Sequence, residues 1–287
     1  MKEKVSPIYI AQQLRQRDLF YFTPSLLADL FSLDQRRVYR LVAQLKDKAL
    51  IAEVEKGKYL LLGLEPGRVL ANPLFIASHL VAPAYVSYWS ALHFYGFTEQ
   101  TPLTTFVTTT KKKQPVTFQY KDKQSGSAHS FRFRFVTVKP RKFFGYRREM
   151  IGGLPVMVAD EAKAIVDSLD LPNYAGGVGE IAKALRVAVD AVEVETLVRY
   201  ANRMGDKSLG SRLGYLLETL GQLAEGVALP PYILEGAASL PVVLERLIRS
   251  ASPVKLDVSG SRSGEIDPRW RVIVNVPERS LIPPGVG

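Results

Sequence analysis

The chain has 287 residues, of which 47% are hydrophobic and 23% are charged, and this composition is that of a folded protein with a hydrophobic core. It contains no cysteine and only three histidines, which excludes disulfides, thiolate zinc sites, iron–sulfur clusters and a cysteine nucleophile. The formal net charge of +10 indicates an anionic partner. We therefore expect no metal and no cofactor, and a surface suited to nucleic acid.

The positive charge lies in the first half of the chain. Residues 1–70 carry 12 basic and 8 acidic side chains, residues 71–155 carry 12 and 3, and residues 156–287 carry 14 and 17. Residues 69–98 contain no Asp, Glu, Lys or Arg, but Pro73 and Pro83 interrupt them, so they predict two short buried helices and not a membrane span. The N-terminal residues lack the apolar run of a secretory signal, so we expect a cytoplasmic protein with no membrane partner.

Three helices are predicted in the first seventy residues. The first covers residues 7–17, and Thr23-Pro24 begins the second, because threonine caps a helix well and proline suits its first position. After a tight turn at residues 32–33, Asp34 caps a third helix that extends to about Lys48. The residues expected on the buried faces are Ile8, Ile10, Ala11 and Leu14, then Leu26, Leu27, Leu30 and Phe31, then Val38, Leu41, Val42 and Leu45.

The third helix presents a basic face. At about 100° per residue, Arg36, Arg40 and Ala43 lie opposite its apolar side. The flanking positions hold Arg37, Gln44, Gln35 and Tyr39. Arginine and glutamine side chains read base edges in the major groove, so the arrangement is typical of the recognition helix of a helix-turn-helix protein. A solvated basic helix face is the alternative interpretation.

Residues 52–61 predict a β-hairpin with Lys56-Gly57 at its turn. This register places Glu55 opposite Lys58 and Val54 opposite Tyr59, which are favourable cross-strand pairs. A basic hairpin directly after a recognition helix is the wing of a winged helix-turn-helix domain, although some winged helices bind protein instead of DNA. The predicted DNA-contacting residues are Thr23, Ser25, Gln35, Arg36, Arg37, Tyr39, Arg40, Gln44, Lys56 and Lys58.

The middle of the chain is its most basic part, because residues 111–148 carry 12 Lys or Arg and one acid, Asp122. Residues 103–109 predict a strand, residues 116–120 resemble its partner, and residues 131–136 alternate with period two. The alternation buries three phenylalanines opposite exposed arginines, which favours a core over a base-stacking surface. The residues of this second phosphate or partner surface are Lys111, Lys112, Lys113, Arg132, Arg134, Arg141, Lys142, Arg147 and Arg148.

The order of these pieces resembles the AbiEi-type antitoxins, which are transcriptional regulators of type IV toxin–antitoxin systems in viral defence. The resemblance rests on the N-terminal domain, on residues 85–102 (YVSYWSALHFYGFTEQTP) with the strand that follows, and on residues 159–169 (ADEAKAIVDSL). Residues 199–203 (RYANR) and 211–218 (SRLGYLLE) resemble a late helical motif of the group. The resemblance implies a repressor that autoregulates its operon by binding inverted repeats with more than one copy, and a nucleotidyltransferase-like toxin as partner.

We therefore predict an α+β protein. Residues 1–68 form the winged helix-turn-helix domain, and residues 69–287 form a mixed α/β antitoxin-type domain with a basic sheet at about 103–148 and a mainly helical second half. In that half Asp160 is expected to cap a helix, residues 193–204 and 209–223 to form helices, and residues 254–258 and 270–274 to form strands. We expect the end, residues 277–287, to be irregular.

The sequence favours a binding protein over an enzyme. Gly176-Gly177-Val178-Gly179 precedes a helix but lacks the strand and the Lys-Ser/Thr pair of a phosphate-binding loop, so we interpret it as a loop. Asp257, Glu265 and Asp267 supply acids without the lysine that a restriction-type nuclease requires. The alternative to a repressor is a regulator without antitoxin activity, or an adaptor whose basic middle face binds RNA or an acidic protein.

Overall fold

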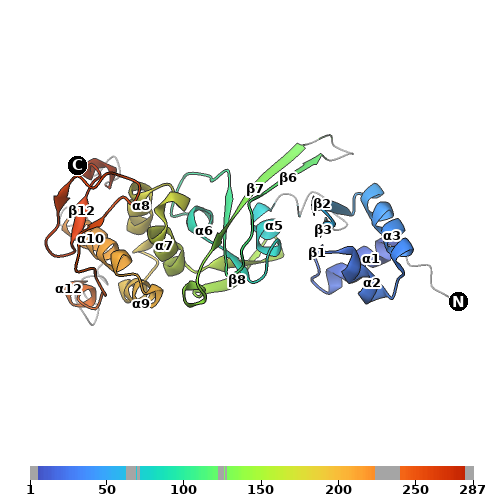
Figure 1. Ribbon diagram of the computed structural model, residues 1–287, viewed down its shortest axis with the longest axis horizontal. Helices are drawn as coiled ribbons and strands as arrows, with labels where there is room; N and C mark the ends of the chain where they lie inside the picture. Colours follow the sequence, from blue (N-terminus) through green and yellow to red (C-terminus); the bar gives the residue numbers. More distant parts are fainter. Residues whose placement is uncertain are drawn as a thin grey trace. The chain divides into compact units, whose positions relative to one another are not determined.

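The computed structural model describes residues 6–62, 69, 72–121, 126, 128–223 and 240–281, and it has a mixed α/β architecture (Figure 1). Two compact units are present. Unit 1 comprises Met1–Ala84, Leu103–Thr137 and Arg148–Met157, and unit 2 comprises Tyr85–Pro102, Val138–Arg147 and Val158–Gly287. Within the described ranges, no helix is both long enough and apolar enough to cross a membrane.

Unit 1 begins with three helices, α1 (Pro7–Gln16), α2 (Pro24–Phe31) and α3 (Gln35–Asp47). The predicted caps are present: the Thr23 hydroxyl accepts from the Leu26 N–H at 3.4 Å, and the Asp34 carboxylate accepts from the Arg37 N–H at 2.9 Å. Ser32, at φ 49°, ends α2 in a left-handed conformation and makes the tight turn before α3.

The buried face of α3 is the predicted one, with Val38, Leu41, Val42 and Leu45 all inside. The prediction was wrong for two residues of the shorter helices, because Ile8 is 47% exposed and Leu30 is 39% exposed. Both helices are short, and each buries a narrower stripe than the sequence pattern offers. Leu27 alone of the predicted α2 stripe is fully buried.

A three-stranded sheet packs beside these helices, with β1 (Tyr21–Phe22), β2 (Ile51–Glu55) and β3 (Lys58–Leu61) in the order β1-β3-β2. Lys56-Gly57 forms the hairpin turn, where Gly57 adopts φ +69°, and Glu55 pairs with Lys58 as predicted. The predicted pairing of Val54 with Tyr59 is wrong: Tyr59 pairs with Glu53, because the register shifts between Glu53 and Glu55.

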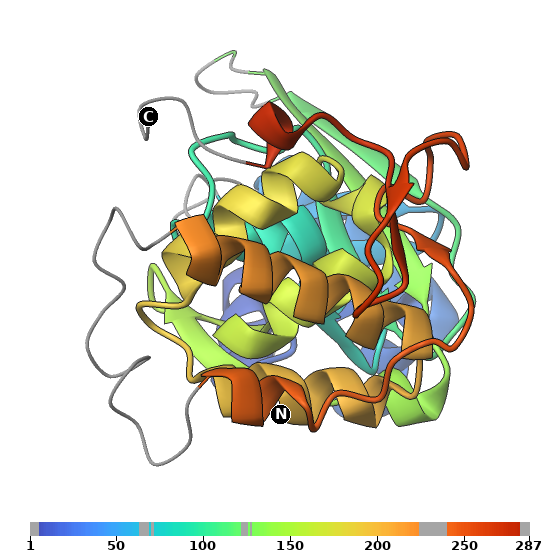
Figure 2. The same ribbon diagram turned by 90° about the vertical axis from the view of Figure 1, so that its left-hand side faces the viewer.

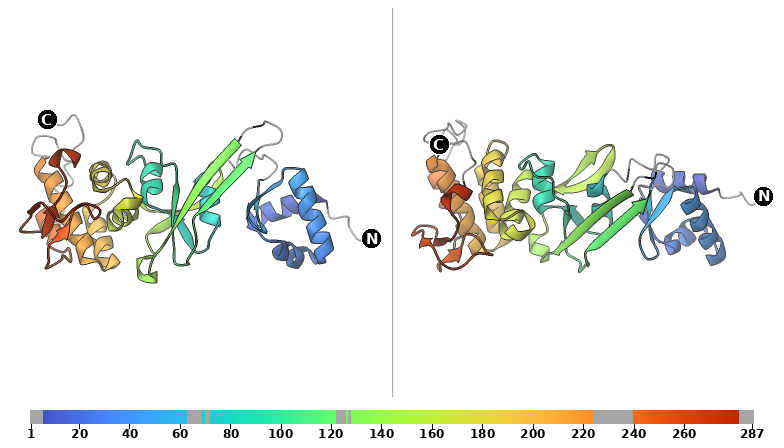
Figure 3. Two further views of the ribbon diagram at one scale, coloured as in Figure 1. Left: turned by 45° about the horizontal axis from the view of Figure 1, so that its top comes forward. Right: turned by 90° about the horizontal axis from the view of Figure 1, so that it is seen from above.

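A second sheet has six strands in the order β6-β7-β5-β4-β9-β8. Its strands are β4 (Ala84–Val86), β5 (Thr105–Thr109), β6 (Val116–Lys121), β7 (Ala128–Thr137), β8 (Tyr146–Ile151) and β9 (Leu154–Ala159). The prediction that β6 is the partner of β5 is wrong, because β7 lies between them, parallel to β5 and antiparallel to β6. Figure 3 shows β6 and β7 (green) as a long two-stranded ribbon.

The alternation in β7 buries Phe133 and Phe135 and leaves Arg132 and Arg134 on the exposed side, as predicted. Phe131 is only half-buried and stacks against Phe118 of β6, with ring centroids 5.8 Å apart. The uncharged residues 69–98 contain the two predicted short helices, α5 (Pro73–His79) and α6 (Tyr88–Phe94), with the unpredicted strand β4 between them. Residues 122–125 and 127 of the basic segment lie outside the described residues.

Unit 2 is mainly helical (Figure 2). It contains α7 (Glu161–Asp170), α8 (Val178–Ala188), α9 (Val194–Met204), α10 (Lys207–Leu223) and α12 (Leu240–Leu244), with the short 3-10 turns η1 (Pro140–Lys142), η2 (Pro172–Tyr174) and η3 (Glu278–Ser280). The α7 helix packs against α6, α8, α9 and α10, and is therefore the central element of the unit. The Gly176–Gly179 segment forms the predicted loop and the first turn of α8.

A small sheet ends unit 2, with β10 (Val254–Lys255), β12 (Val272–Val274) and β11 (Glu265–Ile266) in that order. The two predicted late strands are present but shorter than expected. Trp270 anchors this sheet, because its ring is fully buried against Gly214 of α10, where a Cβ atom would overlap it. The predicted irregular end contains η3, and residues 282–287 lie outside the described residues.

Candidate nucleic-acid interface

The outward face of α3 carries all the predicted groove-reading side chains. Tyr39 is 57% exposed, and the other five, Gln35, Arg36, Arg37, Arg40 and Gln44, are exposed as well. The apolar side of the helix holds them there, because it fixes the rotation of α3 about its own axis. Most of these long side chains thus lie in the first half of one helix.

The arginines of α3 differ in what they already bind. Arg37 forms an ion pair with the capping carboxylate of Asp34 at 3.2 Å, with both side chains more than half exposed. Arg36 and Arg40 form no ion pair with any carboxylate in the described part of the chain. These two guanidinium groups therefore keep all their donors available for a ligand, and Arg37 is partly neutralised.

The start of α2 is arranged differently. The Thr23 hydroxyl is already used by the cap of α2, where it accepts from the Leu26 N–H, whereas Ser25 is exposed. Thr23 can still donate its hydroxyl proton to a phosphate while it accepts from the backbone. Of the two, Ser25 has the side chain with no competing role in the cap.

Glu53 fixes the hairpin turn against α3. One carboxylate oxygen accepts from the Gly57 N–H at 3.0 Å, and the other accepts from Lys46 of α3 at 2.5 Å. The hydrogen bond from Lys46, followed by that from Gly57, holds the pKa of Glu53 below its ordinary value, and the same bond raises the pKa of Lys46. These two hydrogen bonds fix the position of the turn, with its exposed Lys56, beside α3.

Glu55 is the centre of a second cluster. It accepts from the Tyr21 hydroxyl at 2.7 Å, from Lys58 at 3.2 Å, and from Lys113 at 2.6 and 2.7 Å. Burial raises the pKa of Glu55, but these hydrogen bonds outweigh burial and the pKa lies below its ordinary value. Burial and the Glu55 carboxylate raise the pKa of Tyr21. Lys58, which is predicted to bind a phosphate, is therefore already paired with Glu55.

The second basic surface is divided between the two units. Lys111, Lys112, Lys113, Arg132, Arg134 and Arg148 belong to unit 1, and Arg141, Lys142 and Arg147 belong to unit 2. Lys142 is paired with Asp170 at 2.7 and 2.8 Å, and Arg147 is paired with Glu161 through two hydrogen bonds of 2.7 Å. The exposed cations of this set in unit 1, such as Lys111 and Lys112, form the stronger candidates for phosphate contact.

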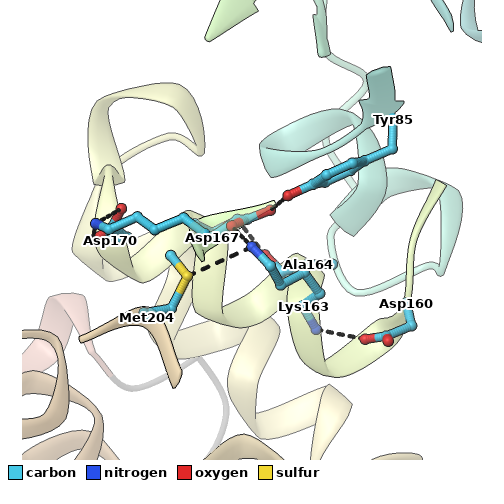
Figure 4. A network of polar contacts seen from close by, with 9 residues as sticks. Tyr85, Asp160, Lys163, Ala164, Asp167, Asp170 and Met204 are labelled. Carbon is cyan, nitrogen blue, oxygen red and sulfur yellow. Dashed lines mark hydrogen bonds and ion pairs between the residues drawn. The ribbon is translucent and has the colours of Figure 1, made fainter. Parts of the chain in front are cut away.

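Unit 2 contains a buried polar network that the sequence did not predict (Figure 4). Lys163 and Asp167, one turn apart on α7, form an ion pair in which the two side chains are 0% and 1% exposed. The Tyr85 hydroxyl donates to the same carboxylate at 3.1 Å, and the Lys163 ammonium lies 3.7 Å from the Met204 sulfur. Burial raises the pKa of Asp167 although Lys163 opposes this. The pair is shielded from any substrate and belongs to the core.

Asp160, predicted to cap α7, does so by accepting from the Lys163 N–H at 2.8 Å, and it also accepts from the Tyr200 hydroxyl at 2.8 Å. Asp257, Glu265 and Asp267, the acids considered for a nuclease, are placed in the small sheet and its connections. Asp257 and Asp267 bind backbone N–H groups there. Across the described ranges, His, Asp and Glu form no group of three that could hold a metal ion.

Comparison with solved structures identifies proteins of similar fold. No protein-family model matches the sequence, and no curated protein matches it. The fold is similar to that of the RV2827C protein from Mycobacterium tuberculosis, with a TM-score of 0.55 and 14% sequence identity over 92% of this chain and 89% of that chain. At this level of identity the likeness concerns the fold alone.

Proposed function

We propose that this protein is a sequence-specific DNA-binding repressor whose N-terminal domain is a winged helix-turn-helix. In this proposal α2 and α3 are the two helices of the motif, and the β2–β3 hairpin is the wing. The observation that carries it is the outward face of α3, where Arg36 and Arg40 form no ion pair with any residue that the structure describes and lie beside Gln35, Tyr39 and Gln44. Arginine pairs with guanine O6 and N7, and glutamine pairs with adenine N6 and N7, through two hydrogen bonds each.

Three features of the domain support a DNA ligand over a solvated basic face. The acids Asp34 and Glu53 are already used, Asp34 by Arg37 and Glu53 by Lys46 and Gly57. The wing turn carries an exposed lysine. The hydrogen bonds of Glu53 hold that turn next to α3, so one element can enter the major groove while the other contacts phosphates.

The wider role follows from the resemblance stated above. We propose that the chain autoregulates its operon as the antitoxin of a type IV toxin–antitoxin pair, binds inverted repeats in more than one copy, and acts in the cytoplasm with a nucleotidyltransferase-like toxin as its partner. A toxin gene beside this one, whose toxicity this chain suppresses, is the expected genetic observation. An adjacent gene of another kind would leave the regulator and remove the antitoxin.

The DNA-binding proposal is tested by selecting a binding site from random duplexes and comparing two variants. Arg36→Ala is expected to weaken binding to the selected site by about 1–3 kcal/mol and to change binding to shuffled DNA little. Lys56→Ala is expected to weaken both by the same factor and to lower the salt slope by about 1. Arg262→Ala, an exposed arginine in unit 2, is the control and should change neither.

Two results would contradict the proposal. An equal loss on selected and shuffled DNA in Arg36→Ala would make this residue a phosphate contact. Retention of the main nucleic-acid affinity after deletion of residues 1–65 would favour the adaptor, in which the basic middle segment binds RNA or an acidic protein.

A further inference from the structure

The three consecutive lysines 111–113 follow β5 in a segment that we call the lysine turn, and their environments differ. Lys111 and Lys112 are exposed, whereas the side chain of Lys113 is only 13% exposed. The Lys113 ammonium makes two short hydrogen bonds to Glu55 and lies 5.7 Å from the centre of the Phe135 ring. Lys113 is therefore held inside unit 1, while its two neighbours are available for a ligand.

Hydrogen bonds with two threonines hold the backbone of this lysine turn. The Thr109 hydroxyl accepts from the Lys111 N–H at 3.2 Å and donates to the Pro83 carbonyl at 2.7 Å, and the Thr137 hydroxyl donates to the Lys111 carbonyl at 3.3 Å. Glu55 on the other side is bound by Tyr21 of β1 and by Lys58 of β3. The Lys113–Glu55 pair thus joins two segments that are each fixed by their own hydrogen bonds.

We propose that Glu55 is a positioning residue that joins the wing to the lysine turn, so that Lys56, Lys111 and Lys112 bind phosphates of the same duplex. The inference rests on the DNA-binding function proposed above. Lys56 directly follows Glu55, and Lys112 directly precedes Lys113, so the exposed lysines flank the ion pair in the sequence on both sides. The lysine turn then extends the phosphate contacts beyond those of the wing.

The salt dependence of DNA binding measures these contacts, because each phosphate neutralised adds about 0.9 to the steepness with which log K falls with log salt concentration, which is called the salt slope. The double variant Lys111→Ala/Lys112→Ala is expected to lower the slope by up to about 1.8. Lys113→Met is expected to lower it by a similar amount although Lys111 and Lys112 remain. Lys113→Arg, which keeps the ion pair, is expected to retain the wild-type slope. If the loss of salt slope in the triple variant Lys111→Ala/Lys112→Ala/Lys113→Met is the sum of the losses in the double variant and in Lys113→Met, the proposal is overturned.

A second measurement needs no DNA. The chain has no cysteine, so cysteines introduced at Lys56 and Lys112 can be labelled selectively with spin labels in the full-length protein. The distance distribution between the labels is expected to be narrow, and to broaden when Lys113→Met or Glu55→Gln is added. An unchanged distribution in both would overturn the proposal. If the distribution broadens but the wild-type protein binds no DNA, the DNA-binding function is refuted and the link from Glu55 to Lys113 is established.

Discussion

Removal of Lys163 should reveal how strongly the buried ion pair of α7 depends on both partners. Lys163→Met keeps the length of the side chain, but the Asp167 carboxylate, which is 1% exposed, then keeps only the hydrogen bond from the Tyr85 hydroxyl among the described residues. Loss of one partner from a buried pair costs about 3–5 kcal/mol. Protonation of Asp167 limits this cost: from an ordinary pKa of 3.8, neutralisation at pH 7 costs about 4.4 kcal/mol. We therefore expect a loss of about 3–4 kcal/mol at pH 7.

The loss of stability in Lys163→Met should also depend on pH. Where Asp167 is protonated in the folded variant and ionised in the folded wild type, the loss of unfolding free energy falls by at most about 1.4 kcal/mol for each pH unit of acidification. This loss should therefore shrink markedly between pH 7 and pH 5. Urea unfolding followed by tryptophan fluorescence measures it, because Trp89 and Trp270 both lie in unit 2 with α7.

The double variant Lys163→Met/Asp167→Leu provides the control. It removes both charges at similar volume and should unfold with a free energy close to the wild type or above it. A penalty below about 1 kcal/mol in Lys163→Met, or one that does not change with pH, would refute the reasoning. So would a double variant as unstable as the single one.

Two further predictions concern packing and acid stability. Gly214→Ala should destabilise unit 2 by about 1–3 kcal/mol in the same urea assay, because the new Cβ would overlap the Trp270 ring. At an open helix position the same substitution stabilises the helix, so a gain in stability would contradict this packing. Because Lys46 lowers the pKa of Glu53, the stabilisation from Glu53 is complete above about pH 4.5 and is lost as the pH falls through the lower folded-state value. The difference in Tm between wild type and Glu53→Gln should therefore narrow below pH 4.5 in thermal melts followed by circular dichroism, and a constant difference would contradict it.

The sequence predicted which side chains of the candidate site are exposed where one helix decides the geometry. The apolar residues of α3 repeat with helical spacing, so Val38, Leu41 and Leu45 determine its buried side and leave Arg36 and Arg40 outside. The caps of α2 and α3 are equally local, since each involves residues three apart. Nothing further along the chain was needed to predict these features.

Features that depend on distant residues could not be predicted in this way. The irregular register between Glu53 and Glu55 replaces the expected Val54–Tyr59 pair, and the place of β7 between β5 and β6 depends on a parallel pairing that local alternation does not specify. The link from Glu55 to Lys113 spans 58 positions. The alternating acids Glu53 and Glu55 of β2 were the sequence signal that could have indicated this link.

The charged residues of α7 show the same limit. Lys163 and Asp167 have the i, i+4 spacing of a solvated helix face, and their burial becomes visible only when α6, α8, α9 and α10 surround the helix. Arg147 and Lys142 were likewise counted as available cations, because Glu161 and Asp170 lie 14 and 28 positions away.

The most direct test of the account is methylation interference on the selected duplex with the wild-type protein and the Arg36→Ala and Arg40→Ala variants. Methylation of guanine N7 blocks the major-groove acceptor that an arginine would use. We expect that methylation of particular guanines prevents binding of the wild type, and that the interference at one such guanine disappears in one of the two variants. Interference from phosphate modification alone, with every guanine tolerant of methylation, would contradict recognition of the major groove by α3.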